Sequence, residues 1–316
     1  MNALNRGFNI ARGDSVYAST AKFDGSARAL TEDEMRKIAP SIFAVTAHES
    51  RSARFMPIPT IEVLRGLMQE GFMPVGVKQG NTRDPGKADF TKHLIRLRRL
   101  DDDVKHKVGD TVCEVLLKNA NDGTAAYDIM AGMFRIRCSN SLVAHTSTLE
   151  SARVRHSGDV QTKVIDATYK VLNEAHNLLA APQDWSQLAM SRDESLVLAE
   201  AAHVLRFADS DGEVHTPFQP QQLLTPRRHG DQNADLWTTF NVVQENVIRG
   251  VPQSEQRRTW HRSEDGRRMR RASMREIGNI DGSVKLNKAL FVLTARMAEL
   301  KGCHSIKPPA EVEFVN

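Results

Sequence analysis

Cysteine is scarce in this sequence, and its spacing suits neither disulfides nor zinc. The 316 residues include three cysteines, Cys113, Cys138 and Cys303. An odd number of widely spaced cysteines is a poor disulfide framework. No C-x-x-C pair and no H-E-x-x-H motif is present to hold a transition metal. We therefore expect a chain without disulfides, without a metal site and without a cofactor.

Long apolar runs and phosphate-binding glycine motifs are also missing. No apolar stretch approaches the roughly 20 residues that cross a bilayer, and the first residues lack the apolar core of a secretory signal. The motifs G-x-x-x-x-G-K-[ST], G-x-G-x-x-G and G-x-S-x-G do not occur. An ATP-driven machine of the P-loop kind is therefore disfavoured. We expect a cytoplasmic protein that does not bind membranes.

Positive charge is present but concentrated. The formal net charge is +4, whereas the segment 249–275 contains nine arginines and three acidic residues, which is 9 − 3 = +6. The rest of the chain is therefore slightly acidic. Such a balance permits nucleic-acid binding without requiring it. Aromatic residues make up only 6% of the chain, so stacking on bases would depend on the few that are exposed.

The order of apolar patterns predicts an α+β protein with an antiparallel sheet followed by helices. Short strands are expected in residues 73–138, where tight connections favour a meander. Asn121-Asp122-Gly123 is a strong turn sequence between two of these strands. Their expected ranges are 73–79, 89–100, 111–119 and 126–138.

Helices are predicted before the sheet and throughout the second half. Thr31 with Glu34 forms a capping-box sequence, and Thr60 is the expected N-cap of a helix that stops at Gly71. The later helices are expected at 160–179, 192–208, 236–250, which is amphipathic and stops at Gly250, and 279–300.

Three regions follow from these patterns. Residues 1–30 are expected to be an N-terminal arm, and residues 31–185 an α+β core. Residues 186–316 are expected to be a helical region, interrupted by the basic segment 249–275, which has little apolar content. Alternatively, all the helices cover one face of the sheet in a single domain.

The stretch "FRIRCSNSLVAH" raises the question of a cysteine nucleophile. Cys138 would need a nearby base, and His145 and His156 follow it. Alternation along a strand instead places Cys138 on the apolar face of the sheet, where free cysteine is commonly a small buried hydrophobe. The same alternation places Arg135 and Arg137 on the opposite face. We favour a structural role for the cysteine.

Two other polar clusters also have structural interpretations. Asn140 suits a tight turn or a helix cap, although its amide is able to contact a substrate. The run Asp101-Asp102-Asp103 resembles a carboxylate cluster for a divalent ion. Consecutive strand residues cannot all point at one ion, and basic runs flank this one. We therefore interpret it as a solvated loop.

Basic residues on the predicted strands and in the basic segment remain. Arginine suits phosphate contacts because its donors form a fixed fork, and a sheet carrying arginines can track a nucleic-acid backbone. The alternative is a charged surface with no partner. The predicted interface consists of Lys92, Arg96, Arg98, Arg99, Arg135, Arg137, Arg153, Arg155, Arg257, Arg258, Arg262, Arg267, Arg268, Arg270 and Arg271.

The order of several short motifs resembles a known family. The motifs are Asn119-x-Asn121-Asp122-Gly123-x-Ala125, Arg135-x-Arg137-Cys138-x-Asn140-Ser141-Leu142 and Arg155-His156. In this order they resemble the phage/plasmid-like family catalogued as domain of unknown function 932, over roughly residues 55–300. The resemblance implies a protein of a plasmid, prophage or other mobile element. It gives Asn121, Asp122, Gly123, Cys138, Asn140 and His156 a family-motif or structural role.

The leading hypothesis is a non-enzymatic DNA-binding protein of a mobile element. The sheet-then-helix order is similar in outline to that of single-strand annealing proteins of recombination, which work as oligomeric rings. That analogy raises single-stranded DNA as the ligand and a homo-oligomer as the active form, but it does not establish a function. The alternatives are a metal-dependent or cysteine-based enzyme acting on nucleic acid, and an interaction protein that blocks a host defence factor.

Overall fold

The chain folds into two compact units. The computed structural model describes residues 9–12, 15–19, 27–51, 59–82, 84–99, 111–135, 152–154, 159–175, 180–263 and 268–306. Unit 1 consists of Met1–His176 with Gly278–Gly282, and unit 2 of Asn177–Ile277 with Ser283–Asn316. In the described part of the chain, no helix has the length and apolar content needed to cross a membrane.

Unit 1 is built on one antiparallel sheet. Each strand pairs with the next along the chain, which confirms the predicted α+β meander. The sheet extends beyond 73–138 at both ends, and residues 9–19 of the predicted N-terminal arm supply two of its strands. In order, the strands are β1 (Asn9–Arg12), β2 (Ser15–Ser19), β3 (Phe72–Gly80), β4 (His93–Arg99), β5 (Thr111–Asn119), β6 (Tyr127–Arg135) and β7 (Ala152–Val154).

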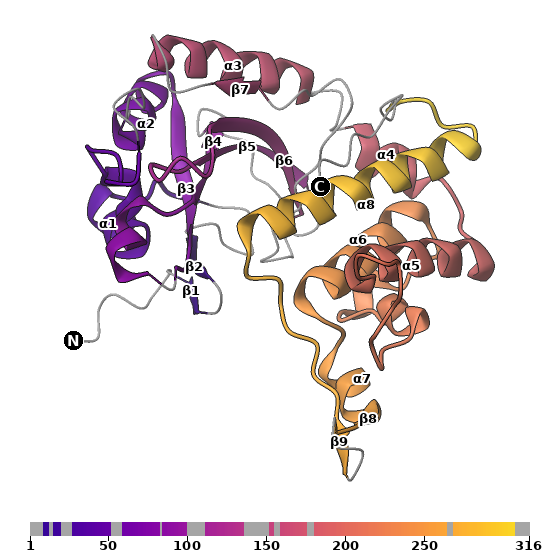
Figure 1. Cartoon of the computed structure of the whole chain (residues 1–316). Coiled ribbons are helices and arrows are strands. Elements are labelled where there is room, and N and C mark those ends of the chain that lie inside the picture. Colours follow the sequence, from indigo (N-terminus) through magenta and orange to yellow (C-terminus); the bar gives the residue numbers. More distant parts are fainter. Residues whose placement is uncertain are drawn as a thin grey trace. The chain divides into compact units, whose positions relative to one another are not determined.

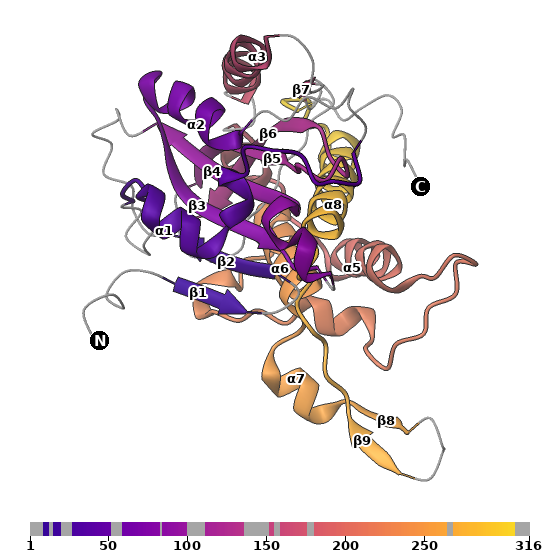
Figure 2. The ribbon, with the colours of Figure 1, turned by 60° about the vertical axis from the view of Figure 1, so that its left-hand side comes forward.

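Helices α1 (Glu32–Ile38) and α2 (Thr60–Gln69) lie on one face of this sheet (Figures 1 and 2). Helix α3 (Val160–Ala175) packs beside α2 and against β5 and β6. Two short 3₁₀ helices, η1 (Pro40–Phe43) and η2 (Pro85–Phe90), contact each other. The apolar residues between these helices and the sheet include Leu64, Ile95, Leu97, Val115 and Leu117, all fully buried.

The predicted capping box of α1 is present. Thr31 Oγ1 accepts a hydrogen bond from Glu34 N at 3.3 Å, and Glu34 Oε2 accepts one from Thr31 N at 3.0 Å. Arg28 donates to the same carboxylate, and this charged hydrogen bond lowers the pKa of Glu34 to about 2. The helix therefore begins where the sequence predicts, and it ends before Pro40.

A network of buried side chains ties α2 to the strand ends. His93 Nδ1 lies 2.9 Å from Ser41 Oγ, and His93 Nε2 lies 2.9 Å from Thr60 Oγ1. Ser41 Oγ donates to Gln79 Oε1 and Asn119 Nδ2 donates to Thr60 Oγ1. Because Ser41 uses its own proton on Gln79, His93 must donate from Nδ1. Thr60 is the first residue of α2 and not the predicted N-cap, and its hydroxyl forms hydrogen bonds within this network and does not cap the helix.

Unit 2 is mainly helical, as the sequence predicts. Its core is a cluster of four aromatic rings in which Trp185 lies 6.1 Å from Trp237, 5.8 Å from Phe240 and 5.2 Å from Phe291 between ring centroids. The elements are α4 (Ala181–Ser186), α5 (Arg192–Phe207), η4 (Pro220–Leu224), η5 (His229–Asp231), α6 (Leu236–Arg249), α7 (Gln253–Arg258), β8 (Trp260–Arg262), β9 (Met269–Arg271) and, from Ser283 on, α8 (Ile280–Leu300).

Helix α6 is the central helix of unit 2. The sequence predicts an amphipathic helix here, but every residue from 236 to 248 is buried. Its polar side chains have partners: Asn246 Nδ2 donates to Leu223 O, and Gln244 Nε2 donates to Asn287 Oδ1. Because neighbouring segments accept hydrogen bonds from these amide nitrogens, the polar side of the helix is also covered.

Gly250 ends α6, as predicted, and no other residue fits there. Its φ of +85° and ψ of 160° lie in a region that is essentially restricted to glycine. A β-carbon at this position would overlap the carbonyl group of Met274. The glycine therefore allows the chain after β9 to pass directly against the end of α6.

Replacing Gly250 with Ala is expected to destabilise unit 2 by at least about 3 kcal/mol, because strain and backbone overlap add together. Gly212→Ala is the matched control. Gly212 also has a positive φ, +84°, but a β-carbon there meets nothing within 4 Å, so we expect a cost of about 1–2 kcal/mol. Urea unfolding followed by tryptophan fluorescence measures both, since all three tryptophans lie in unit 2. Equal losses of unfolding free energy in the two variants would contradict the claim that overlap with Met274 adds to the cost at Gly250.

Candidate nucleic-acid interface

Two of the predicted phosphate contacts are buried inside unit 1. Arg96 and Arg98 are 5% and 7% exposed, and both donate to Glu114, which is 1% exposed. Arg96 Nε lies 2.7 Å from Glu114 Oε2, and Arg98 Nη2 lies 2.7 Å from Glu114 Oε1. The carboxylate of Glu114 on β5 thus accepts hydrogen bonds from two of the three arginines on β4. These arginines hold the sheet together and are not part of an exposed interface.

Glu114→Gln is expected to destabilise unit 1 by about 3–5 kcal/mol, because it removes the carboxylate charge that accepts hydrogen bonds from two buried guanidinium groups. The control is Glu32→Gln. Glu32 also accepts two hydrogen bonds from one arginine, Arg65, at 2.8 Å each. Because both groups are exposed, we expect the free energy of unfolding to decrease by less than about 1 kcal/mol. Chemical unfolding followed by far-ultraviolet circular dichroism compares the two. Similar decreases would show that the buried cluster contributes little.

The other sheet residues of the predicted interface are placed only in part. Lys92 forms an ion pair with Asp281, and Arg99 is exposed, with its guanidinium 5.8 Å from the ring centroid of Phe72. Arg135 lies on β6 and Arg153 on β7. Several predicted residues lie outside the described part of the chain: Arg137, Cys138, Asn140, Arg155, His156, Arg267 and the run 101–103.

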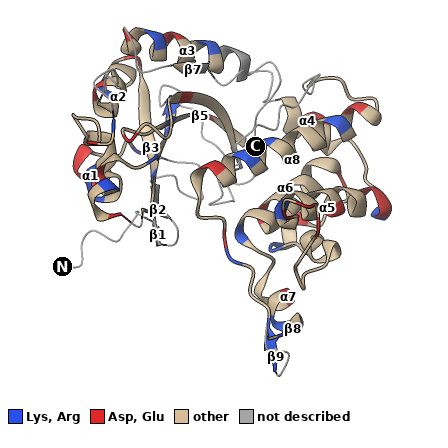
Figure 3. Ribbon diagram, viewed as in Figure 1, with Lys and Arg blue, Asp and Glu red and all other residues tan. Residues whose placement is uncertain are grey.

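The described part of the basic segment 249–275 has regular secondary structure, although its apolar content is low. Helix α7 is followed by a hairpin in which β8 pairs antiparallel with β9. Trp260 is opposite Arg271, His261 opposite Arg270, and Arg262 opposite Met269. Figures 1 and 2 show the hairpin extending away from α5 and α6, and Figure 3 shows basic residues on both of its strands. We call α7, β8 and β9, with the described residues that connect them (Thr259, Ser263 and Arg268), the basic ribbon.

The basic ribbon exposes both charge and apolar surface. Trp260 is 48% exposed and Met269 is 58% exposed. The guanidinium of Arg271 lies over the indole ring of Trp260, 5.3 Å from its centroid, which keeps both flat groups on one face of the hairpin. The described arginines of the ribbon are all exposed: Arg257, Arg258, Arg262, Arg268, Arg270 and Arg271.

Arg249, by contrast, is not part of this surface. It donates to Glu245 at 3.2 Å, and Arg228 donates to both oxygens of the same carboxylate at 2.7 and 2.8 Å. Glu245 is 3% exposed. Unit 2 therefore resembles unit 1 in having one buried glutamate that accepts hydrogen bonds from two arginines, and a third arginine, Arg227, lies 3.9 Å from the same carboxylate.

Groups suited to catalysis are few among the described residues. No group of three or more His, Cys, Asp or Glu side chains is arranged there to hold a metal ion. Cys113 on β5 is half-buried, and its burial and the nearby Glu114 raise the pKa of its thiol to about 12. A thiol with this pKa is a poor nucleophile at neutral pH because the thiolate is the reactive form.

Alkylation should distinguish the two described cysteines. With iodoacetamide at about pH 8, where thiolate governs the rate, Cys303 should react well before Cys113 in the folded protein. Cys303 follows the end of α8, is half-buried, and has its sulfur 3.3 Å from the hydroxyl oxygen of Ser305. Peptide mapping by mass spectrometry follows each site separately, and labelling in denaturant shows that both peptides are detected. Faster labelling of Cys113 would contradict its buried, protonated state.

Comparison with known proteins identifies the family. The family model described as Domain of unknown function (DUF932) matches residues 47–291. The chain belongs to this family. It is 39% identical over 268 residues to the UPF0380 protein YafZ and 40% identical over 268 residues to the UPF0380 protein YfjQ, both of Escherichia coli (strain K12). Each match covers 84% of this chain and 90% of the relative. No solved structure matches the chain.

Membership of the DUF932 family confirms the predicted resemblance, and the described motif residues have structural roles. Asn121 is fully buried, and its backbone N–H donates to Phe90 O at 3.1 Å. Asp122 Oδ1 accepts from Thr124 N at 2.9 Å, and Gly123 has a φ of +79°. These residues form the turn between β5 and β6, as the sequence predicts.

Proposed function

We propose that the chain binds DNA through the basic ribbon, with single strands preferred over duplex. The observation that supports this most is the combination of six exposed arginines and one exposed tryptophan in the basic ribbon. Exposed arginines provide contacts to phosphates, and an exposed indole provides a surface on which a base can stack.

The electrostatics of the ribbon support an anionic partner. Among its described residues the one carboxylate is that of Glu255, which lies 3.7 Å from Arg258. The remaining arginines of the hairpin have no carboxylate within ion-pair distance in the described part of the chain. An uncompensated cluster of this kind raises the local concentration of a polyanion, and its binding weakens steeply as salt is added.

The exposed aromatic side chain of Trp260 supports the proposed preference for single-stranded over double-stranded DNA. Trp260 and Arg271 lie on the same face of the hairpin because they are cross-strand partners. Bases that are not paired can stack on an exposed aromatic ring, and each such stack is worth about 1–3 kcal/mol. A duplex keeps its bases stacked internally, so its binding would depend on phosphate contacts alone.

This proposal reduces the predicted interface to fewer residues than the sequence suggests. The ribbon arginines stay in it, whereas Arg96 and Arg98 belong to the sheet core. Arg99, Arg135 and Arg153, with the predicted residues outside the described part, stay predictions. The same is true of the annealing activity, the homo-oligomer, the mobile-element role and the cytoplasmic location.

Arg268→Ala with Arg270→Ala is expected to weaken binding of a fluorescent single-stranded oligonucleotide by roughly tenfold at moderate salt, because two phosphates would no longer be neutralised. The slope of log K against log salt should decrease in magnitude by about 0.7 for each phosphate that is no longer neutralised. The matched control removes two exposed arginines from helices of the same unit, Arg192→Ala with Arg296→Ala. Fluorescence anisotropy measures both variants.

Trp260→Ala should weaken single-strand binding by about fivefold or more and leave duplex binding nearly unchanged, because only unpaired bases stack on the indole. Absence of binding to either DNA at low salt would contradict the proposed function. Equal decreases in affinity for the ribbon variant and for its control would instead assign binding to net charge and not to the ribbon.

A further inference from the structure

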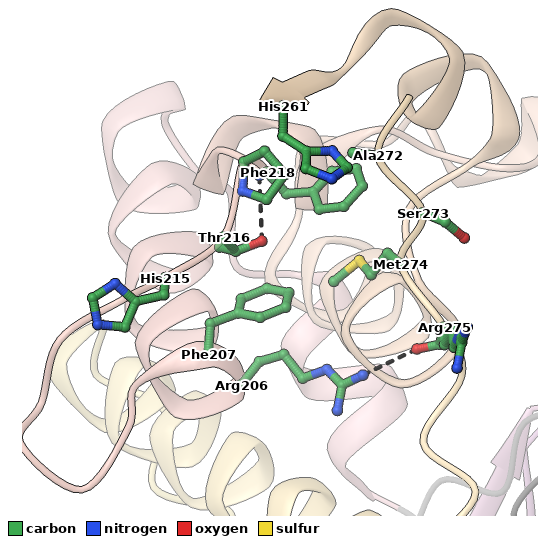
Figure 4. A pocket seen from close by; sticks show the side chains of 11 residues that line it. Arg206, Phe207, His215, Thr216, Phe218, His261, Ala272, Ser273, Met274 and Arg275 are labelled. Carbon is green, nitrogen blue, oxygen red and sulfur yellow. Dashed lines mark hydrogen bonds between the residues drawn. The ribbon is translucent and has the colours of Figure 1, made fainter. Parts of the chain in front are cut away.

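A cavity of about 380 Å³ lies in unit 2 at the foot of the hairpin (Figure 4). Its wall comes from the end of α5, from the segment before η4, from β8 and from the chain that follows β9. Pockets that bind small ligands in proteins are commonly about 300–1,000 Å³. The cavity is lined by eleven residues, none of which is Asp or Glu.

Arg206 gives the cavity its charge. Its side chain is half-buried, its Nη2 donates to the backbone carbonyl of Arg275 at 3.0 Å, and its Nε is buried without a hydrogen-bond partner. Loss of hydration lowers the pKa of this guanidinium. The comparable arginines Arg96, Arg98, Arg228 and Arg249 each contact a buried glutamate. Arg206 has no carboxylate partner in the described part of the chain.

Aromatic rings give the cavity a second kind of surface. The ring of Phe207 lies beside Arg206, with the guanidinium 5.6 Å from the ring centroid. In Figure 4, Phe207 points between Thr216 and Met274, and Phe218 lies near His261. Phe218 is held in place because its carbonyl accepts from His203 Nε2 at 2.7 Å. The cavity thus presents an apolar aromatic wall next to a cation that has no carboxylate partner among the described residues.

We infer that this cavity binds one nucleotide, with the base against Phe207 and the phosphate at Arg206. A nucleotide is the class of ligand that combines a flat aromatic group with an anion at short range. This inference rests on the proposed function, because the nucleotide is taken to come from a strand that the ribbon binds. His261, which lines the cavity, belongs to the same hairpin as the ribbon arginines. A nucleotide of the bound strand would reach the cavity from β8.

Titration calorimetry of the full chain with deoxyadenosine monophosphate tests the cavity directly. Deoxyadenosine and inorganic phosphate, titrated separately, measure the two halves of the ligand. We expect the nucleotide to bind more tightly than either half. No heat with the nucleotide at millimolar concentrations, or phosphate alone binding as tightly as the nucleotide, would overturn the inference.

Two variants test which residue of the cavity binds each half of the nucleotide. Arg206→Gln should weaken nucleotide binding by about tenfold and leave deoxyadenosine unchanged, because only the charge is removed. Phe207→Leu should weaken both by about fivefold to tenfold, because the aromatic face is removed while the apolar volume is retained. Arg296→Gln, on the exposed surface of α8, is the control and should match the wild type. Wild-type affinity in both cavity variants would overturn the assignment.

A competition experiment identifies the source of the nucleotide. A single-stranded oligonucleotide added at saturation should displace the mononucleotide if the cavity takes a base of the bound strand. If the mononucleotide and the oligonucleotide bind at the same time, the ligand of the cavity is a free nucleotide. The inference that the cavity takes a nucleotide of the bound strand would then be overturned. The two proposals can fail separately. Mononucleotide binding without oligonucleotide binding would contradict the proposal that the ribbon binds DNA. Oligonucleotide binding without mononucleotide binding would contradict the proposal that the cavity binds a nucleotide.

Discussion

A buried glutamate in this protein requires arginine partners, and Glu114 in unit 1 and Glu245 in unit 2 each accept hydrogen bonds from two guanidinium groups. Removing a charge from water costs several kcal/mol, and this cost is recovered only when the partner ion and its hydrogen bonds are well placed. Glu114 receives Arg96 and Arg98, and Glu245 receives Arg228 and Arg249. The requirement separates the arginines that maintain the fold from those that remain available to a ligand.

The sheet of unit 1 depends on the same rule applied to uncharged groups. The ring of His93 is fully buried, and both of its nitrogens lie within hydrogen-bond distance of a hydroxyl group, those of Ser41 and Thr60. Each hydroxyl also bonds to an amide, on Gln79 or Asn119. An unpaired polar group in such a place would cost about 1–3 kcal/mol. The network therefore favours one arrangement of α2 against the strand ends and excludes others in which these groups are unpaired.

Much of the fold was predictable because its strands and helices follow simple periods. The expected strand 111–119 has the bounds of β5, and the helix expected at 236–250 ends at Gly250. Strands β1 and β2 were missed because four or five residues in a sequence rich in small and polar types give no clear alternation. The hairpin was missed for a related reason. Its strands have three residues each, so exposed charge and not an apolar period dominates their sequence.

The candidate site was less predictable, because the function of an arginine depends on a partner that its local sequence does not reveal. The alternation Arg96-x-Arg98 looks like the exposed face of a strand, and only the pairing of β4 with β5 shows that Glu114 covers it. Arg206, in the last turn of α5, looks like an ordinary cation at a helix C-terminus. Its importance follows from the burial of its Nε, which has no hydrogen-bond partner.

Both features proposed to contact a ligand lie in unit 2, and they share structural elements. His261 lies on the cavity side of β8, while its neighbour Trp260 is on the alternate face with Arg271. The segment Ala272–Arg275, which closes the cavity wall, continues directly from β9 and passes against Gly250. A ligand that stacks on Trp260 and one that enters the cavity would therefore both bind to the same short hairpin. The two proposals therefore concern one element of the fold, which is anchored where α6 ends.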